Sequence, residues 1–207
     1  RIVDSTDSTV SSFTFESKKY QNLLDRFQVC ELTDPLFIST SEIVLQAYDS
    51  KEKTKVVLKL MKDSDKFYAE LEGRSNLDPT FILPVHGALV DSDFSVSYLG
   101  DIPVSKVSGL ATEMKEFVRG LIDRTMEAGV EKSGSFMSEE TFPYLLCLQG
   151  YDRSLADTLA RTSIPSLNLA RRVVRDAVVG LILLHTENKI HGNLTPHNIV
   201  RVGSQWK

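Results

Sequence analysis

The segment His191-Gly-Asn-Leu-Thr-Pro-His-Asn-Ile-Val200 says more about fold and function than any other stretch of this 207-residue chain. It follows the longest predicted helix, 167–187, for which Ser166 is a suitable N-cap. Taken by itself, the segment is typical of a loop between a helix and a strand, with asparagines that bond to local backbone groups. The order of the elements upstream argues for a more specific interpretation.

Five upstream segments have the apolar, β-branched pattern of strands: 27–32, 42–48, 55–61, 81–90 and 144–148. A helix is predicted from about Ser64, because Asp63 or Ser64 can cap it and Phe67 and Leu71 share one face. A short helix is predicted after Gly150, before the long helix at 167–187.

Residues 91–142 form a long connection between the last two predicted strands, and a strongly amphipathic helix is predicted within it at 113–128. Its apolar face includes Phe117 and Leu121. Such a face usually packs on its own domain. The alternative is that Phe117 and Leu121 contact another signalling protein.

The composition is that of a globular protein, with 42% hydrophobic and 25% charged residues. A net charge of -4 gives no electrostatic footprint for nucleic acid or an anionic membrane. No apolar run approaches the roughly 20 residues that span a bilayer. Cys30 and Cys147 lie in apolar surroundings without metal-ligand spacing, which favours reduced thiols and a cytoplasmic location. Residues 1–20 are rich in Ser and Thr and are expected to form a flexible tail.

The segment 191–200 resembles the catalytic loop of protein kinases, whose common form is His-Arg-Asp-Leu-Lys-Pro-x-Asn-Ile-Val. The match holds at His191, Leu194, Pro196, Asn198, Ile199 and Val200. The order of predicted elements also resembles that family, from about residue 27 to residue 207. The resemblance implies an α+β fold, with an antiparallel β lobe and one main helix at 21–148, including the helical insertion at 91–142. It further implies a hinge and the beginning of the helical lobe at 149–207, ending before an Asp-Phe-Gly magnesium motif.

The match fails at the positions that carry out phosphoryl transfer. Asn193 stands where the family has its catalytic aspartate, and Thr195 stands where it has a lysine. An amide cannot take up a proton at neutral pH, and a hydroxyl does not stabilise phosphoryl charge as an ammonium does. Both residues are therefore expected to be non-functional in catalysis.

The ATP-binding positions are partly retained. Val56-Val-Leu-Lys59 resembles the kinase Val-Ala-Ile-Lys strand, which implies that Lys59 contacts phosphates and pairs with a helix glutamate. Glu70 matches that glutamate best, and Glu72 is a weaker candidate. The resemblance further implies that Leu146, Cys147 and Leu148 form a nucleotide slot. It also implies that Asp152 contacts the ribose and that Asn198 is a magnesium ligand. For Asp152, capping of the next helix is the alternative role.

The glycine-rich loop that covers the phosphates in kinases is absent. If Val44 is its terminal valine, then Phe37, Ser39 and Glu42 occupy the glycine positions. Glycine allows backbone amides to approach phosphates, whereas Phe37 adds bulk and Glu42 adds negative charge. Binding of ATP and Mg²⁺ is therefore expected to be weak or absent.

These observations favour a protein kinase-like domain that is catalytically impaired, a pseudokinase, and that regulates or scaffolds signalling. One alternative is an active atypical Ser/Thr kinase that binds ATP through Lys59, Glu70 and Asn198, with a base supplied elsewhere. A second alternative is a small-molecule phosphotransferase, since enzymes acting on aminoglycosides or choline share the layout and an H-x-D-x-x-x-x-N loop.

Overall fold

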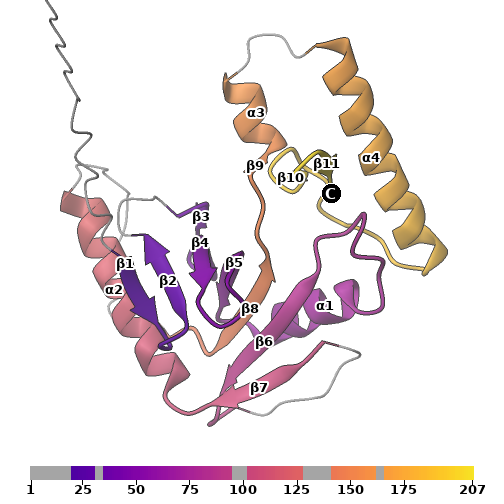
Figure 1. Cartoon of the computed structure of the whole chain (residues 1–207). Coiled ribbons are helices and arrows are strands. Elements are labelled where there is room, and N and C mark those ends of the chain that lie inside the picture. The colour runs from indigo at the N-terminus through magenta and orange to yellow at the C-terminus, as the bar shows by residue number, and fades with distance from the viewer. Residues whose placement is uncertain (1–19, 31–34, 95–101, 128–140, 162–165) are drawn as a thin grey trace, which may run out of the picture.

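The computed structural model describes residues 20–30, 35–94, 102–127, 141–161 and 166–207 (Figure 1). Within these ranges the fold is mixed α+β, with a large curled sheet, four helices and a second small sheet. The α+β class expected from the sequence is confirmed. The expected tail at 1–20 lies outside the described residues, except for Tyr20, which begins the first strand.

The large sheet has the strand order β1-β2-β4-β5-β8-β6-β7, and β3 pairs with β4. Neighbouring strands are antiparallel, except for the parallel pair β6 and β7. The strands are β1 (Tyr20–Leu23), β2 (Phe27–Cys30), β3 (Phe37–Ile38), β4 (Glu42–Asp49), β5 (Thr54–Met61), β6 (Val85–Asp91), β7 (Val104–Val107) and β8 (Tyr144–Gln149).

Three of these strands, β1, β3 and β7, are additional to those predicted from the sequence. The strand predicted at 81–90 begins only at Val85. The N–H groups of Phe81 and Ile82 instead donate to the carbonyl of Asp78, which closes a turn ahead of the strand.

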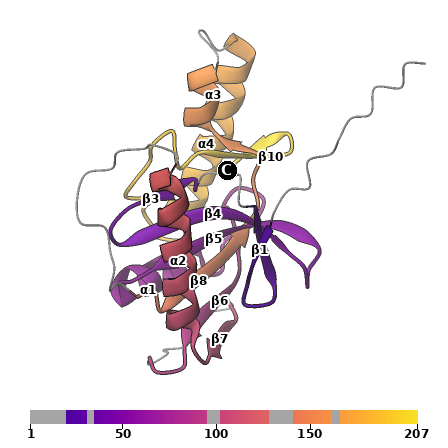
Figure 2. The same ribbon diagram turned by 90° about the vertical axis from the view of Figure 1, so that its left-hand side faces the viewer.

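Two helices cover opposite faces of the large sheet (Figures 1 and 2). Helix α1 (Ser64–Arg74) buries Phe67 and Leu71 on one face, in a cluster with Val57 and Met61 of β5. Asp63 is its N-cap, because the carboxylate accepts hydrogen bonds from the N–H groups at positions 65 and 66. Period-2 alternation sends the intervening side chains of β5 to the other face.

Helix α2 (Leu110–Glu127) packs on that other face, with Leu58 and Leu60 of β5 in the same apolar cluster. Its two large apolar residues, Phe117 and Leu121, are only 2% and 7% exposed. They pack against the sheet of their own chain, as such a face usually does. The helix fills the core because its wide apolar stripe matches an uncovered sheet face.

The remaining residues form a smaller unit beside the α1 face of the sheet (Figure 1). It consists of β9 (Arg153–Ser154), α3 (Leu155–Arg161), α4 (Leu167–Thr186), β10 (Val200–Val202) and β11 (Gln205–Trp206). The small sheet has the order β11-β10-β9. The buried carboxylate of Asp176 in α4 accepts a hydrogen bond from the Trp206 N–H at 3.2 Å, which fastens the small sheet to the helix.

No helix within the described residues is long and apolar enough to cross a membrane.

Candidate functional site

A cavity of about 450 Å³ separates the large sheet and α1 from the smaller unit. From the sheet and α1, its wall includes Val44, Lys59 and Glu70. From the smaller unit, it includes α4 and the loop with Asn193 and Asn198. The segments on which the sequence interpretation depended therefore meet at one cavity.

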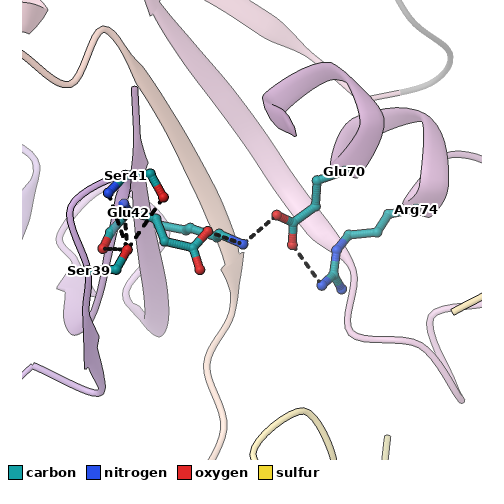
Figure 3. A network of polar contacts seen from close by, with 6 residues as sticks. Ser39, Ser41, Glu42, Glu70 and Arg74 are labelled. Atoms are coloured by element: carbon teal, nitrogen blue, oxygen red, sulfur yellow. Dashed lines mark hydrogen bonds and ion pairs between the residues drawn. The ribbon is translucent and has the colours of Figure 1, made fainter. Parts of the chain in front are cut away.

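Lys59 lies in the middle of β5 and forms an ion pair with Glu70 of α1; Figure 3 shows Glu70 and its second partner, Arg74. Its Nζ atom is 2.6 Å from Oε2 of Glu70, and the two side chains are only 16% and 19% exposed. The helix glutamate paired with Lys59 is thus Glu70, whereas Glu72 is exposed on the same helix. Alternation along β5 and the helical period place Lys59 and Glu70 on facing surfaces.

Glu70 is held by a second cation. Nη2 of Arg74, one helical turn later, lies 3.0 Å from Oε1 of Glu70, while Nη1 of Arg74 donates to the carbonyl of Leu83 at 2.8 Å. Burial alone would raise the pKa of Glu70, but the charges of Arg74 and Lys59 outweigh it and hold that pKa below its usual value. Glu70 is therefore a carboxylate at neutral pH.

Lys59 also has a second partner, which sequence reasoning did not anticipate. Oε2 of Glu42, the first residue of β4, lies 3.1 Å from the Lys59 ammonium. The sequence had placed Glu42 near the expected phosphates but gave no register between β4 and β5. Val44 pairs with Lys59 in the observed register, so Glu42 lies diagonally opposite Lys59 on the same face.

The loop at 191–200 is stabilised by its own polar side chains. Nδ2 of Asn198 donates to the carbonyl of Asn193 at 2.8 Å, and the Asn193 N–H donates to Nδ1 of His191 at 3.3 Å. Burial, together with the positive charge of Arg74, lowers the pKa of His191. Asn193 and Asn198 are among the described residues that line the cavity, but Thr195 is not. The backbone carbonyl of Thr195 accepts from the Asn198 N–H.

Of the three residues expected to form a nucleotide slot, Leu148 alone is among the described lining residues of the cavity. Leu146 is fully buried under α1. Cys147 belongs to the apolar cluster on the α2 face, so its thiol points away from the cavity. Burial raises the pKa of this thiol to about 11. Cys147 and Leu148 lie on different faces of the sheet, because adjacent strand residues point to opposite faces.

Asp152 is not among the described lining residues either. Its carboxylate accepts a hydrogen bond from the Gly203 N–H at 3.1 Å, and its own N–H donates to the carbonyl of Arg201. The cap of α3 is formed instead by Ser154 and Asp157, whose side chains accept from each other's N–H groups at 3.1 and 2.9 Å.

A magnesium ion fits poorly to the donors that the structure brings together. Asn198 offers one amide oxygen, whose orientation is fixed by the hydrogen bond that Nδ2 donates to the Asn193 carbonyl. Within the described residues there is no group of three or more His, Cys, Asp or Glu that could hold a metal ion. The carboxylates of Glu42 and Glu70, which also line the cavity and would suit Mg²⁺, are both paired with the Lys59 ammonium.

The arrangement therefore offers a cavity, a half-buried, ion-paired lysine and a loop of amide side chains. The amide side chain of Asn193 cannot act as a general base. No protein-family model matches this sequence, and the comparison with curated proteins finds no similar protein.

Proposed function

We propose that this chain is a cytoplasmic protein kinase-like domain that does not transfer phosphate efficiently and that regulates or scaffolds signalling through protein contacts. The observation that carries the proposal is that Lys59 and the loop 191–200 line one cavity from opposite sides. The two segments with the strongest kinase resemblance lie 132 positions apart, from 59 to 191, in the sequence.

The order of elements supports the same proposal. The strand with Lys59 is followed by α1, which supplies Glu70, and then by β6 and β8 of the large sheet, with β7 and α2 in the connection between them. After them come the short α3, the long α4 and the loop with Asn198. This is the order that the resemblance implies from the first strand to the catalytic loop, with α2 as an insertion.

The chemistry of the cavity argues against efficient transfer. The amide of Asn193 stands at the position of the general base, and loss of a general base typically costs about 10²- to 10⁴-fold in rate. The ammonium of Lys59 is shared by two carboxylates, those of Glu42 and Glu70. A phosphate would have to compete with both of them.

An exposed apolar stripe on α4 supports a role in protein contacts. Val174, Val178 and Ile182 follow one another at intervals of four residues and are 62%, 45% and 57% exposed. Residues at this spacing form a continuous surface on one side of a helix. Exposed apolar surfaces of this kind often mark protein interaction sites. The stripe therefore replaces Phe117 and Leu121 as the candidate contact surface.

The first test is a phosphotransfer assay on the purified chain with Mg-ATP and a generic Ser/Thr protein substrate. Wild type, Lys59→Ala and Asn193→Asp should all give the same background signal. Asn193→Asp is included because it supplies the missing carboxylate without restoring the glycine-rich loop. Transfer by wild type that is lost in Lys59→Ala would show an active atypical kinase and overturn the proposal.

The second test addresses the contact surface. Cross-linked partners of the wild type in native extracts should be lost in the variant Val178→Asp/Ile182→Asp. Leu159→Asp is the matched control, because Leu159 is also an exposed apolar helix residue, 43% exposed, on α3. Equal loss in both variants, or retention in both, would contradict a role for the α4 stripe.

A further inference from the structure

Glu42 stands out because it adds a second carboxylate to an ion pair that is complete without it. The Lys59 ammonium lies 2.6 Å from Glu70 and 3.1 Å from Glu42, so the two acids approach it from opposite sides (Figure 3). Glu42 is half-buried, with 26% of its side chain exposed. The lysine of this cavity is therefore neutralised by groups of the protein itself.

The turn before β4 fixes the position of Glu42. The Ser39 hydroxyl accepts a hydrogen bond from the Glu42 N–H at 3.0 Å and donates to the Glu42 carbonyl at 3.1 Å. The Ser39 N–H donates to the same carbonyl at 2.9 Å. Because both backbone groups of Glu42 are bonded to Ser39, the backbone position from which the Glu42 side chain extends is fixed (Figure 3).

The ion pairs continue beyond Glu70 and leave the charges balanced. Glu42, Lys59, Glu70 and Arg74 form a chain of alternating negative and positive groups. Both cations are engaged, since Arg74 also donates to the carbonyl of Leu83. An incoming phosphate would have to displace one carboxylate and would then lie beside the other. In a half-buried site, where solvent screening is weak, such repulsion between like charges is strong.

Part of the remaining wall is apolar and is suited to an apolar ligand body, although Asp176, Asn193, Asn198 and Lys207 also line the cavity. Val44, Val57 and Leu148 lie on the sheet side of the cavity, and Leu181 and Leu184 lie on the α4 side. A cavity of about 450 Å³ between two apolar walls has the size and character typical of small-molecule sites.

We propose that Glu42 determines the charge of the ligand that this cavity accepts. By sharing the Lys59 ammonium with Glu70, Glu42 makes the cavity a site for an uncharged, largely apolar molecule and disfavours molecules that carry phosphate. The inference rests on the proposed function in one respect, which is that a ligand binds in the cavity beside Lys59.

The test is calorimetric titration of the full chain, without added metal, using adenosine, AMP and ATP. These probes share one aromatic body and differ in the number of phosphates. Wild type should bind adenosine, and its affinity should fall with each added phosphate. The variant Glu42→Gln should bind ATP about tenfold more tightly, with little change for adenosine, because the Lys59 charge is then neutralised by Glu70 alone.

Glu72→Gln is the matched control. It removes the same charge, but Glu72 is exposed on α1 and is not among the described lining residues. It should leave all three affinities unchanged. An ATP gain in Glu72→Gln equal to that in Glu42→Gln would overturn the proposal, because net charge would then explain it.

A wild-type measurement keeps the proposal falsifiable if Glu42→Gln fails to fold. Raising the salt concentration should narrow the difference between adenosine and ATP, because screening weakens the repulsion at the open side of the cavity. Wild type that binds ATP as tightly as adenosine, or that does not bind adenosine, would overturn the proposal. Phosphate transfer in the separate activity assay would overturn the proposed function. The preference of the cavity for an uncharged ligand would still be decided by these titrations.

Discussion

The Nζ atom of Lys189 lies 2.7 Å from the carbonyl oxygen of Ser75, the residue that caps the C-terminus of α1. The same ammonium donates to the carbonyl of Glu72 at 2.9 Å. Carbonyls at the end of a helix lack partners within the helix, and a cation there also interacts favourably with the helix dipole. Lys189 thus joins the segment after α4 to the helix that carries Glu70.

Replacement of Lys189 with Met should lower the free energy of unfolding by about 1–2 kcal/mol, because two charge-assisted hydrogen bonds are lost and part of their surroundings is open to solvent. Urea denaturation followed by tryptophan fluorescence would measure this change in the free energy of unfolding. Lys66→Met, at an exposed position near the start of α1, is the control and should have little effect. Equal destabilisation by the two variants would contradict the assigned role of Lys189.

Gly150 and Gly73 should respond in opposite directions to substitution by Ala. A Cβ atom at Gly150 would lie 2.5 Å from the backbone oxygen of Lys55, a contact that requires the strands to move. Gly150→Ala should therefore destabilise the protein by about 1–3 kcal/mol. A Cβ atom at Gly73, within α1, would meet nothing within 4 Å. Gly73→Ala should stabilise the protein by about 0.5–1 kcal/mol, because alanine has the higher helix propensity.

Thermal unfolding of these two variants would check both signs. A stabilising Gly150→Ala would mean that the close approach between Gly150 and β5 is not a feature of the folded protein. A destabilising Gly73→Ala would contradict the open surroundings of Gly73.

The pairing of Lys59 with Glu70 was expected from the resemblance of Val56–Lys59 to the kinase strand, and the period of α1 is compatible with it. Phe67 and Leu71 fix the buried face of α1, and Glu70 falls beside them. The contact between Glu42 and Lys59 depends instead on the register of β4 against β5. No periodicity within either strand specifies that register, so the contact could not be predicted.

The face of Cys147 was unpredictable for a different reason. Strand β8 is buried on both sides, so its sequence is a continuous apolar run with no alternation to mark which residues point toward the cavity. Strand β7 was missed because it is only four residues long and has Ser105 and Lys106 at its centre. Its place beside β6 arises from tertiary pairing and not from local propensity.

Cys147 should resist alkylation in the native protein. The side chain is 3% exposed, and burial raises its pKa to about 11, so the reactive thiolate is scarce at pH 8. Iodoacetamide treatment followed by peptide mass spectrometry should show Cys147 unmodified in buffer and fully modified in 6 M guanidinium chloride. Rapid native modification of Cys147 would show that its face of β8 is open.

Asp49 should make stability depend on pH in the acid range. Its side chain is 1% exposed and lies 2.6 Å from Nη2 of Arg26. Burial alone would raise the pKa of Asp49, but hydrogen bonds from Arg26 and from the Glu52 N–H hold it below its usual value. Because the folded-state pKa is the lower one, the stabilisation is fully present above the unfolded-state pKa, about 4. It is lost as the pH falls through the folded-state pKa.

The variant Asp49→Asn isolates this contribution. At pH 7 it should be less stable than wild type by about 1–3 kcal/mol, because the buried pair with Arg26 is broken. The difference should shrink below about pH 4, where the Asp49 carboxyl gains a proton in the unfolded wild-type chain, and should continue to shrink until the folded-state carboxyl is protonated at lower pH. Glu70 titrates in both proteins, so its effect cancels in the comparison. Urea unfolding of both proteins between pH 7 and pH 3 measures the difference, and a constant value across that range would show that Asp49 does not contribute through its charge.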